Sequence, residues 1–258
     1  MGTQIDLDAY HTNGFALVRH VFDAATLSDL QQETDALLER ASRGGRATEA
    51  TWKGAWRESA GVGVADAPPA TRVDSIHNVQ NHSAVFTRAL VDPRLTDLAA
   101  ELIGPNVQLH HTKLHNKPPA VGSPFPMHQD YPYFPHTQHT MIAAIIHLDD
   151  ATVDNGCICA VAGSHTLGPL EHRRDNSFYL DTDEWPLARA RPVEARAGDV
   201  LLFSYFTVHG SYVNTSTRPR RILLIQMRSP DDRPTTDQHR SPGQGTMLRG
   251  INPNALEI

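Results

Sequence analysis

The sequence predicts an α+β protein in which helices come first and short, mostly antiparallel strands build a barrel or sandwich in the second half. Helical periodicity dominates to about residue 103, and short apolar or alternating runs dominate from 107 to 227. Gly, Asn, Asp and Ser turn signals separate these runs. No internal repeat or linker interrupts the 258 residues, so we expect a single domain, 1–258.

The N-terminal part of the chain contains the expected helices. A short helix begins near Asp8 and is stopped by Gly14, and the apolar stretch 15–21 follows as a strand. Leucines recur at helical spacing over 23–40. A further helix is predicted over 93–103, with proline near its start and Gly-Pro after its end.

Two long stretches lack a periodic pattern. Residues 42–70 are poor in large apolar side chains, which is typical of a lid or mobile loop and equally of plain disorder. The tail 230–258 is rich in Pro, Gly and charge and is expected to be irregular. Between them, five runs are predicted strands: 107–114, 140–148, 157–161, 200–206 and 222–227.

Composition excludes several classes of protein. The chain is 40% hydrophobic and 20% charged, as in an ordinary soluble protein, and its net charge of -6 argues against a nucleic-acid partner. No signal peptide or apolar run of about 18 residues is visible, so neither export nor a membrane partner is expected. Cys157 and Cys159 are interpreted as small core residues of a reduced, cytoplasmic protein.

The strongest candidate site begins with His128 and Asp130, which are two residues apart and therefore leave one face of a strand together. An imidazole and a carboxylate so placed can hold two positions of a metal, and a second histidine would complete the facial triad of non-haem Fe(II) oxygenases. His147 and Asp149 form a similar pair, which we interpret as chance. His209, at the end of an apolar strand, is the candidate third ligand.

Arg220 strengthens this interpretation. It enters the apolar strand 222–227 eleven residues after His209. A buried guanidinium requires an anion, and a dicarboxylate co-substrate would satisfy it through a bidentate fork. Ser211 adds a hydroxyl donor nearby.

Several motifs occur in the order found in one enzyme family. They are His128-Gln129-Asp130, Asp154-Asn155-Gly156-Cys157, Ala162-Gly163-Ser164-His165, Ala197-Gly198-Asp199, His209-Gly210-Ser211, and Asn214 with Ser216 and Arg220. In this respect the chain resembles the phytanoyl-CoA dioxygenase family. The resemblance implies a double-stranded β-helix (a jelly-roll, cupin-like core) with flanking N-terminal helices.

The resemblance also implies the cofactors and their ligands. They would be Fe(II), held by His128, Asp130 and His209, with 2-oxoglutarate as co-substrate and O2. Arg220 would hold the distal carboxylate of 2-oxoglutarate with help from Ser211. The remaining candidates for contact with 2-oxoglutarate, by position, are His111 and Arg72. Ile146 stands where the phytanoyl-CoA branch carries a tryptophan beside the co-substrate.

The expected activity is oxidation, usually hydroxylation, of an unactivated C–H bond in a small metabolite or natural-product intermediate, with release of succinate and CO2. Asp130 fills the position that halogenating relatives leave open for chloride, so we expect a hydroxylase and not a halogenase. The alternatives are hydroxylation of a fatty acyl-CoA, a cupin-type metal enzyme with non-oxidative chemistry, and an inactive binding protein. Oligomeric state cannot be read from the sequence.

Overall fold

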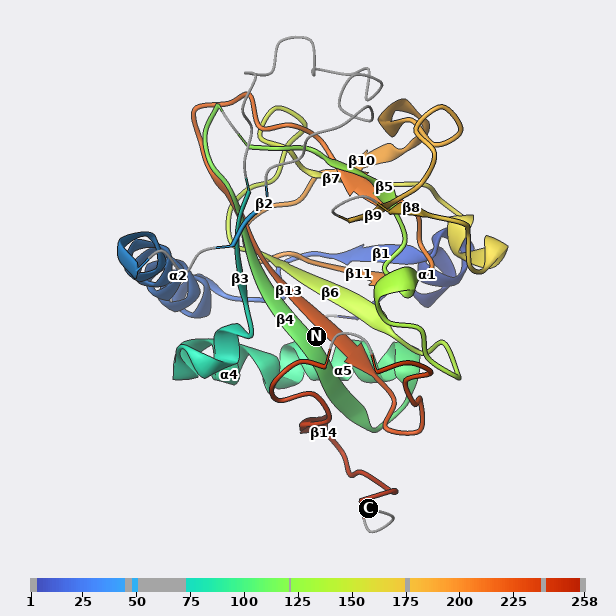
Figure 1. Ribbon diagram of the computed structural model, residues 1–258. Helices are drawn as coiled ribbons and strands as arrows, with labels where there is room; N and C mark the ends of the chain where they lie inside the picture. The colour runs from blue at the N-terminus through green and yellow to red at the C-terminus, as the bar shows by residue number, and fades with distance from the viewer. Residues whose placement is uncertain are drawn as a thin grey trace.

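The computed structural model describes residues 4–44, 48–50, 73–120, 122–174, 177–237 and 240–255. Two antiparallel sheets form its centre (Figure 1). The large sheet has eight strands in the order β1-β11-β6-β13-β4-β3-β2, with β14 paired to β4. The small sheet has four strands in the order β10-β7-β12-β5, and β8 and β9 form a separate two-stranded ribbon.

The strands are β1 (Phe15–Val18), β2 (Thr48–Ala50), β3 (Val73–His77), β4 (Val107–Lys117), β5 (Phe125–His128), β6 (Ile142–His147), β7 (Ile158–Ala160), β8 (Arg173–Arg174), β9 (Phe178–Tyr179), β10 (Arg191–Val193), β11 (Val200–Ser204), β12 (His209–Ser211), β13 (Arg220–Arg228) and β14 (Met247–Arg249). The α-helices are α1 (Leu7–Asn13), α2 (Ala24–Gly44), α4 (Ala84–Leu90) and α5 (Pro93–Ile103). Short 3-10 turns are η1 (Val79–Asn81), η2 (Tyr131–Tyr133), η3 (Ser164–Leu167) and η4 (Leu187–Arg189).

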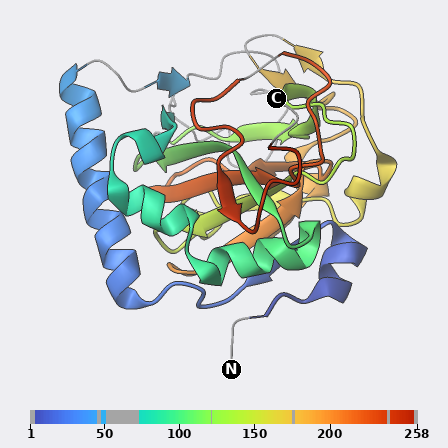
Figure 2. The same ribbon diagram turned by 90° about the horizontal axis from the view of Figure 1, so that it is seen from below.

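Helices α2, α4 and α5 cover the outer face of the large sheet, as Figure 2 shows from below. The buried cluster between them joins helical side chains such as Leu30, Phe86 and Leu98 to Ile146 and Leu202 of the sheet. This apolar layer closes one side of the sheet to water. The other side is left for the small sheet.

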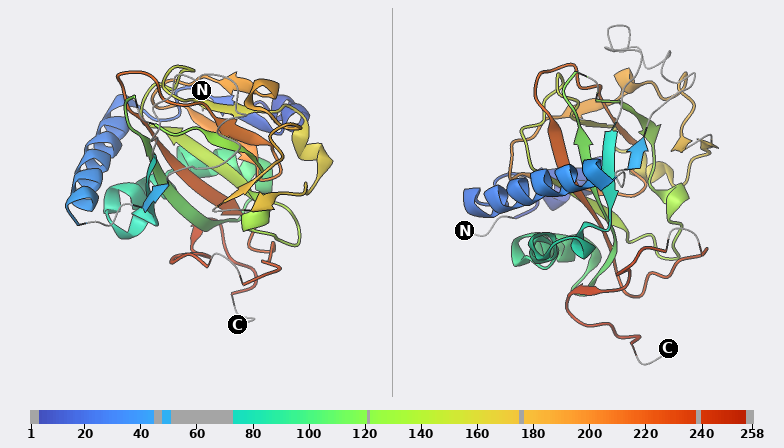
Figure 3. Two further views of the ribbon diagram at one scale, coloured as in Figure 1. Left: turned by 45° about the horizontal axis from the view of Figure 1, so that its top comes forward. Right: turned by 60° about the vertical axis from the view of Figure 1, so that its left-hand side comes forward.

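The inner face of the large sheet packs against the small sheet. Ile145, Leu201 and Phe203 belong to this second cluster, together with Ile158 of β7. Successive side chains of a strand point to opposite faces, so Ile145 lies inside while Ile146 lies under the helices. In Figures 1 and 3 the small sheet lies at one end of the molecule, and β14 lies at the other. The expected jelly-roll core with flanking helices is confirmed.

The predicted helix signals act as expected. The Asp6 side chain accepts a hydrogen bond from the Ala9 amide at the start of α1, and Gly14 ends that helix with φ 83°. Helix α5 has Pro93 in its first turn and an N-cap from Asp92. Both helices are therefore set by local chemistry that is legible in the sequence.

The structure also departs from the expectations at several elements. Helix α2 continues to Gly44, so residues 42–44 are helical and do not belong to a loop. Helix α4 and strand β3 were not predicted, because each is too short to establish a period. Within the tail, β14 pairs with β4, and the rest of the described tail is irregular.

Part of the sequence lies outside the described residues. Arg72 and 51–70 of the expected lid are among them, so their expected roles stay predictions, as does the single-domain organisation. Among the helices that are described, none is both long enough and apolar enough to cross a membrane.

Candidate metal and co-substrate site

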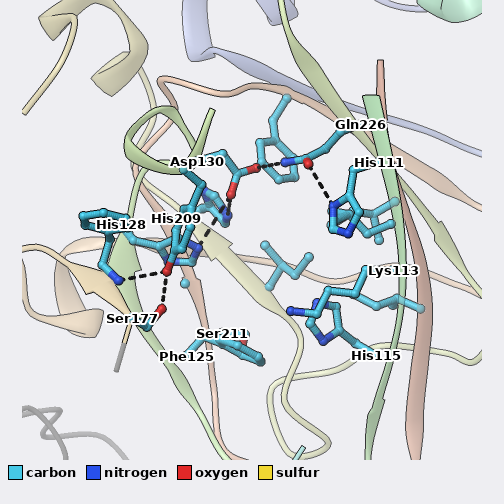
Figure 4. A pocket seen from close by; sticks show the side chains of 18 of the residues that line it. His111, Lys113, His115, Phe125, His128, Asp130, Ser177, His209, Ser211 and Gln226 are labelled. Carbon is cyan, nitrogen blue, oxygen red and sulfur yellow. Dashed lines mark hydrogen bonds and ion pairs between the residues drawn. The ribbon is translucent and has the colours of Figure 1, made fainter. Parts of the chain in front are cut away.

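Two neighbouring strands bring the three candidate metal ligands together. Strand β5 ends at His128 and β12 begins at His209, and the two residues lie opposite each other in the small sheet. Asp130 follows two residues after His128. The ligand atoms of the three side chains all lie within 4.8 Å of one another, and each histidine Nε2 is 3.9 Å from Asp130 Oδ1. Figure 4 shows the group on one side of a cavity.

Backbone carbonyls orient both imidazoles. The Nδ1 of His128 lies 2.8 Å from the Pro126 carbonyl oxygen, and that of His209 lies 2.9 Å from the carbonyl of Thr207. A carbonyl can only accept, so in each ring Nδ1 carries the proton and Nε2 keeps its lone pair. Burial and the neighbouring His209 also hold the pKa of His128 well below its ordinary value. Neutral imidazoles with Nε2 directed at one point suit a metal.

The second oxygen of Asp130 is held by a hydrogen-bond chain. Gln226 Nε2 donates to Asp130 Oδ2 at 3.0 Å, and Gln226 Oε1 lies 3.3 Å from His111 Nδ1. His111 Nε2 in turn lies 2.9 Å from His77 Nδ1. Because Oδ2 is occupied by the amide, Oδ1 is the oxygen that faces the two histidines. This chain of hydrogen bonds fixes the carboxylate of Asp130 in the orientation that a metal would require.

A cavity of about 320 Å³ lies between the sheets beside these ligands. Its lining includes Ile145 and Phe203 from the core, Tyr133 and Phe178 from the loops, and Arg220 from β13. The volume is at the small end of the range for ligand pockets, about 300–1,000 Å³.

Arg220 lies in the cavity wall with an unmet hydrogen-bonding need. Its residue exposure is 2%, and its Nε donates to the Gly156 carbonyl at 3.1 Å. Its Nη1 is buried and has no hydrogen-bond partner among the described residues. Burial lowers the pKa of Arg220 to about 10, which still leaves the guanidinium charged at neutral pH. Such a group calls for an anion.

Ser211, on β12 of the small sheet, also lines the cavity and is itself held by a buried lysine. Lys117 Nζ donates to Ser211 Oγ at 2.7 Å and also to the Tyr212 carbonyl. Burial and the nearby Arg220 lower the pKa of Lys117 well below its ordinary value. With its oxygen accepting from Lys117, the Ser211 hydroxyl can direct its own hydrogen into the cavity.

The arrangement fits the iron and 2-oxoglutarate that the sequence motifs imply. Two neutral nitrogens and one carboxylate oxygen match the facial triad of non-haem iron sites. The buried Nη1 of Arg220 and the hydroxyl of Ser211, which line the same cavity, offer donors that a carboxylate needs. His111 also lines the cavity, next to the Asp130 side of the site. Of the seven predicted site residues, the structure thus brings six together, and the seventh, Arg72, is not described.

Sequence reasoning missed several cavity residues and misplaced one. Lys113, Gln226 and His77 line the cavity without having been singled out. Alternation along 107–117 could have indicated Lys113. Ile146 lies under the helices, and its neighbour Ile145 lines the cavity instead. The position expected to face the co-substrate was therefore wrong by one residue, which on a strand means the opposite face.

The residues expected to be structural lie outside the site. Asp149 is paired with Arg221 at 2.7 Å, and His147 is buried with its pKa lowered by desolvation to about 4. His165 Nε2 lies 3.1 Å from the His11 carbonyl. These contacts support the interpretation of the His147 and Asp149 pair as chance.

A family comparison decides the assignment. The model of "Phytanoyl-CoA dioxygenase (PhyH)" matches residues 10–222. The chain belongs to the phytanoyl-CoA dioxygenase family. Membership confirms the expected family and the general class, iron- and 2-oxoglutarate-dependent dioxygenases.

Members of the family with curated names differ in their named substrates. The chain is 33% identical over 151 residues to the probable alpha-ketoglutarate-dependent hypophosphite dioxygenase of Stutzerimonas stutzeri, covering 54% of this chain and 51% of that protein. It is 28% identical over 252 residues to the ectoine dioxygenase of Halomonas elongata (88% and 70%). It is 29% identical over 178 residues to peroxisomal phytanoyl-CoA dioxygenase of Mus musculus (64% and 52%). The match spans about half the length of the first and third of these relatives.

Solved structures share the fold over nearly the whole chain. The alpha-ketoglutarate-dependent epimerase SnoN from nogalamycin biosynthesis has a TM-score of 0.71 at 22% identity, covering 94% of this chain and 96% of SnoN. The apoform of EctD from S. alaskensis has a TM-score of 0.69 at 22% identity (97% and 85%). These likenesses support the jelly-roll architecture of the family.

Proposed function

We propose that this protein is an Fe(II)- and 2-oxoglutarate-dependent dioxygenase that hydroxylates, or otherwise oxidises, an unactivated C–H bond of a small organic molecule. Succinate and CO2 would be released. The observation that carries the proposal is the placement, in one cavity, of the His128, Asp130 and His209 triad and the buried, unpaired Nη1 of Arg220. The triad alone would serve many metal reactions. Arg220 adds the requirement for an anionic co-substrate.

Each residue has a part in this proposal. The triad would hold iron, which when bound with 2-oxoglutarate activates O2 for C–H oxidation. Arg220 and Ser211 would bind the distal carboxylate and so fix the direction in which the co-substrate lies. Gln226 keeps Asp130 in its ligand orientation. Asp130 fills the position that a halide would need, which supports oxygen transfer over halogenation.

A small substrate is favoured over a fatty acyl-CoA. The cavity volume of about 320 Å³ is small for a site that must also hold 2-oxoglutarate. Relatives include enzymes named for hypophosphite, for ectoine and for 2-aminoethylphosphonate, all small molecules. A small metabolite or natural-product intermediate therefore suits both the cavity and the names of these relatives.

The first experiment is an anaerobic titration of the protein with Fe(II) and 2-oxoglutarate. The chelate should produce the weak visible metal-to-ligand charge-transfer band, and its amplitude reports the affinity for 2-oxoglutarate. Arg220→Met should bind iron normally while its affinity for 2-oxoglutarate falls about 100-fold, which corresponds to the roughly 3 kcal/mol of a strong charge-assisted hydrogen bond.

Arg221→Met is the matched control. Arg221 is the next residue along the same strand, but it pairs with Asp149 and Asp35 away from the cavity. Its loss should leave the affinity for 2-oxoglutarate unchanged. Absence of the band in the wild-type protein would reject the proposed function, and loss of iron from the Arg220 variant would reject the role given to Arg220.

A further inference from the structure

The inner face of β4 carries basic or imidazole side chains at four alternate positions, His111, Lys113, His115 and Lys117. Alternate residues of a strand share a face, and the first three of these line the cavity. Leu114, between them, belongs to the core under the helices. In Figure 4 this wall faces His128, Asp130 and His209 across the cavity.

The proposed function gives no role to Lys113, which belongs to this wall. Its side chain points into the cavity (Figure 4), and it makes no hydrogen bond or ion pair with any residue that the structure describes. Burial lowers the pKa of Lys113 to about 8, and the attraction of Asp130 partly opposes this shift. At pH 7 the amine is therefore mostly protonated. Lys113 is half-buried, and its ammonium faces the cavity without a close counter-charge, so an anion beside it would be stabilising.

The proposed cofactors bring no net negative charge to balance that ammonium. A divalent metal and the dianion of 2-oxoglutarate carry opposite and equal charge, so their joint binding leaves the balance of the cavity unchanged. Among the described lining residues, Lys113 and Arg220 are cations and Asp130 is the carboxylate. Arg220 is assigned to the distal carboxylate of 2-oxoglutarate. Lys113 then keeps its need for a counter-charge.

The two cations lie at different places along the wall. In the sheet, Lys113 lies opposite Leu224, whereas Arg220 lies opposite Lys117. Four residues separate these pairs, about 13 Å along a strand at roughly 3.3 Å per residue. Burial keeps the pKa of His115, beside Lys113, well below its ordinary value, so its ring is a neutral hydrogen-bonding group.

We propose that Lys113 binds an oxyanion of the primary substrate, a carboxylate or a phosphonate, and that the substrate is a small anion held on the β4 wall opposite the metal. This inference rests on the proposed function and names its substrate class. The apolar rings of Phe125, Tyr133 and Phe178 in the same cavity would contact the carbon part of the molecule. His115 would add a neutral hydrogen bond beside the ammonium.

The test uses protein loaded with Zn(II), which is redox-inert, and 2-oxoglutarate. Methylphosphonate and acetate are the probes, titrated by calorimetry, with tert-butanol as a neutral probe. At least one of the two anions should bind the wild-type protein saturably in the millimolar range, and tert-butanol should not. Lys113→Met should weaken binding of the anion at least tenfold, because it removes the positive charge. Lys113→Arg should retain most of the binding, because it keeps the charge.

Two controls test whether Lys113 acts specifically and whether it binds the substrate anion or 2-oxoglutarate. Arg43→Met removes the same charge from the exposed end of α2 and should leave anion binding unchanged. The charge-transfer band of the Fe(II) and 2-oxoglutarate complex should show the same 2-oxoglutarate affinity in Lys113→Met as in wild type. A loss of that affinity would assign Lys113 to the co-substrate and overturn the inference.

Two other results would also overturn it: equal anion binding by wild type and Lys113→Met, or no binding of either anion by a wild-type protein that forms the band. Absence of the band itself would reject the proposed function instead.

Discussion

Gly156 determines where Arg220 lies. It has φ +87°, and a Cβ at this position would stand 2.7 Å from the Tyr212 carbonyl oxygen. Its own carbonyl accepts from Arg220 Nε. A side chain here would therefore strain the turn and displace the oxygen that positions the guanidinium.

Gly156→Ala should accordingly lower stability by about 1–3 kcal/mol and weaken 2-oxoglutarate binding several-fold. Denaturant unfolding and the charge-transfer titration measure the two effects. Gly104→Ala is the control, because Gly104 also has a positive φ but has open space around it. That variant should lose some stability and keep its 2-oxoglutarate affinity. Unchanged binding in Gly156→Ala would show that the turn does not position Arg220.

The two cysteines offer a test of the core at the same scale. Cys157 and Cys159 are buried and free, and burial raises the pKa of each thiol to about 12. Neither should react with Ellman's reagent in the native protein at pH 8, and both should react in denaturant. Rapid labelling of the native protein would contradict the core role that the sequence predicted.

There is a physical reason why the sequence indicated some site residues and not others. His128, Asp130, His209 and Arg220 stand in motifs, so they could be found. Lys113 stands in no motif, and a β-bulge in β4 opposite Gln226 and Met227 interrupts the alternation that could have indicated it. Leu109 faces the helices before the bulge, and His111 faces the cavity after it. Assigning alternate residues of 107–117 to the two faces of the sheet therefore fails at the bulge, because the extra residue reverses the direction of the side chains that follow.

At the scale of elements, Asp199 fastens the end of β1 to the start of β11. Its carboxylate accepts from the backbone amides of His20 at 2.9 Å and Arg196 at 2.8 Å, and from the Arg19 guanidinium at 2.7 Å. Burial alone would raise the pKa of Asp199, but these donors together lower it below the ordinary value of 3.8. The ionised form is therefore the one that stabilises this junction.

Asp199→Asn should lose about 2–3 kcal/mol of unfolding free energy at pH 7, since charge-assisted bonds are lost. A lowered folded pKa contributes stability above the unfolded pKa, and that contribution disappears as the pH falls below about 4 through the folded value. The gap between wild type and variant should therefore shrink from pH 6 to pH 3 in urea unfolding. Asp97→Asn, which removes an exposed pair with Arg249, serves as control. A gap that stays constant with pH would contradict the assignment.

Elements with strong local signals were predictable, and those set by distant contacts were not. Helix α5 has its cap and proline in the sequence, and it was predicted with the bounds that the structure shows. The residues of β3 form a strand because they pair with β4, a partner about forty residues away in sequence. Strand β14 likewise exists because β4 offers a free edge at Val107 and Gln108.

At the scale of the whole molecule, the fold surrounds its cavity with apolar layers and places cations inside it. Helices close the outer face of the large sheet, and Arg220 and Lys113 line the cavity on the inner face. Buried cations without anions destabilise the ligand-free protein. Binding of an anionic ligand should therefore stabilise the molecule.

Addition of Zn(II) and 2-oxoglutarate at about 100 times the dissociation constant should stabilise the protein by about 2.7 kcal/mol. For a chain of this size the midpoint of thermal unfolding should rise by roughly 5–10 °C. Arg220→Met should show a much smaller rise at the same concentration, and its ligand-free form should be no less stable than wild type. Equal rises in both proteins would contradict the placement of the co-substrate on Arg220.

The orientation of the two imidazoles has a practical consequence for handling the protein. Their Nε2 lone pairs are set by backbone carbonyls, so we expect little reorganisation of the two rings when a metal binds. Affinity should then follow the general order for divalent ions, in which nickel and copper exceed iron. Protein purified on a nickel resin will carry nickel in place of iron and will be inactive until it is stripped with a chelator and reloaded anaerobically. The metal found after purification will thus reflect exposure during preparation, and iron dependence must be established by reconstitution.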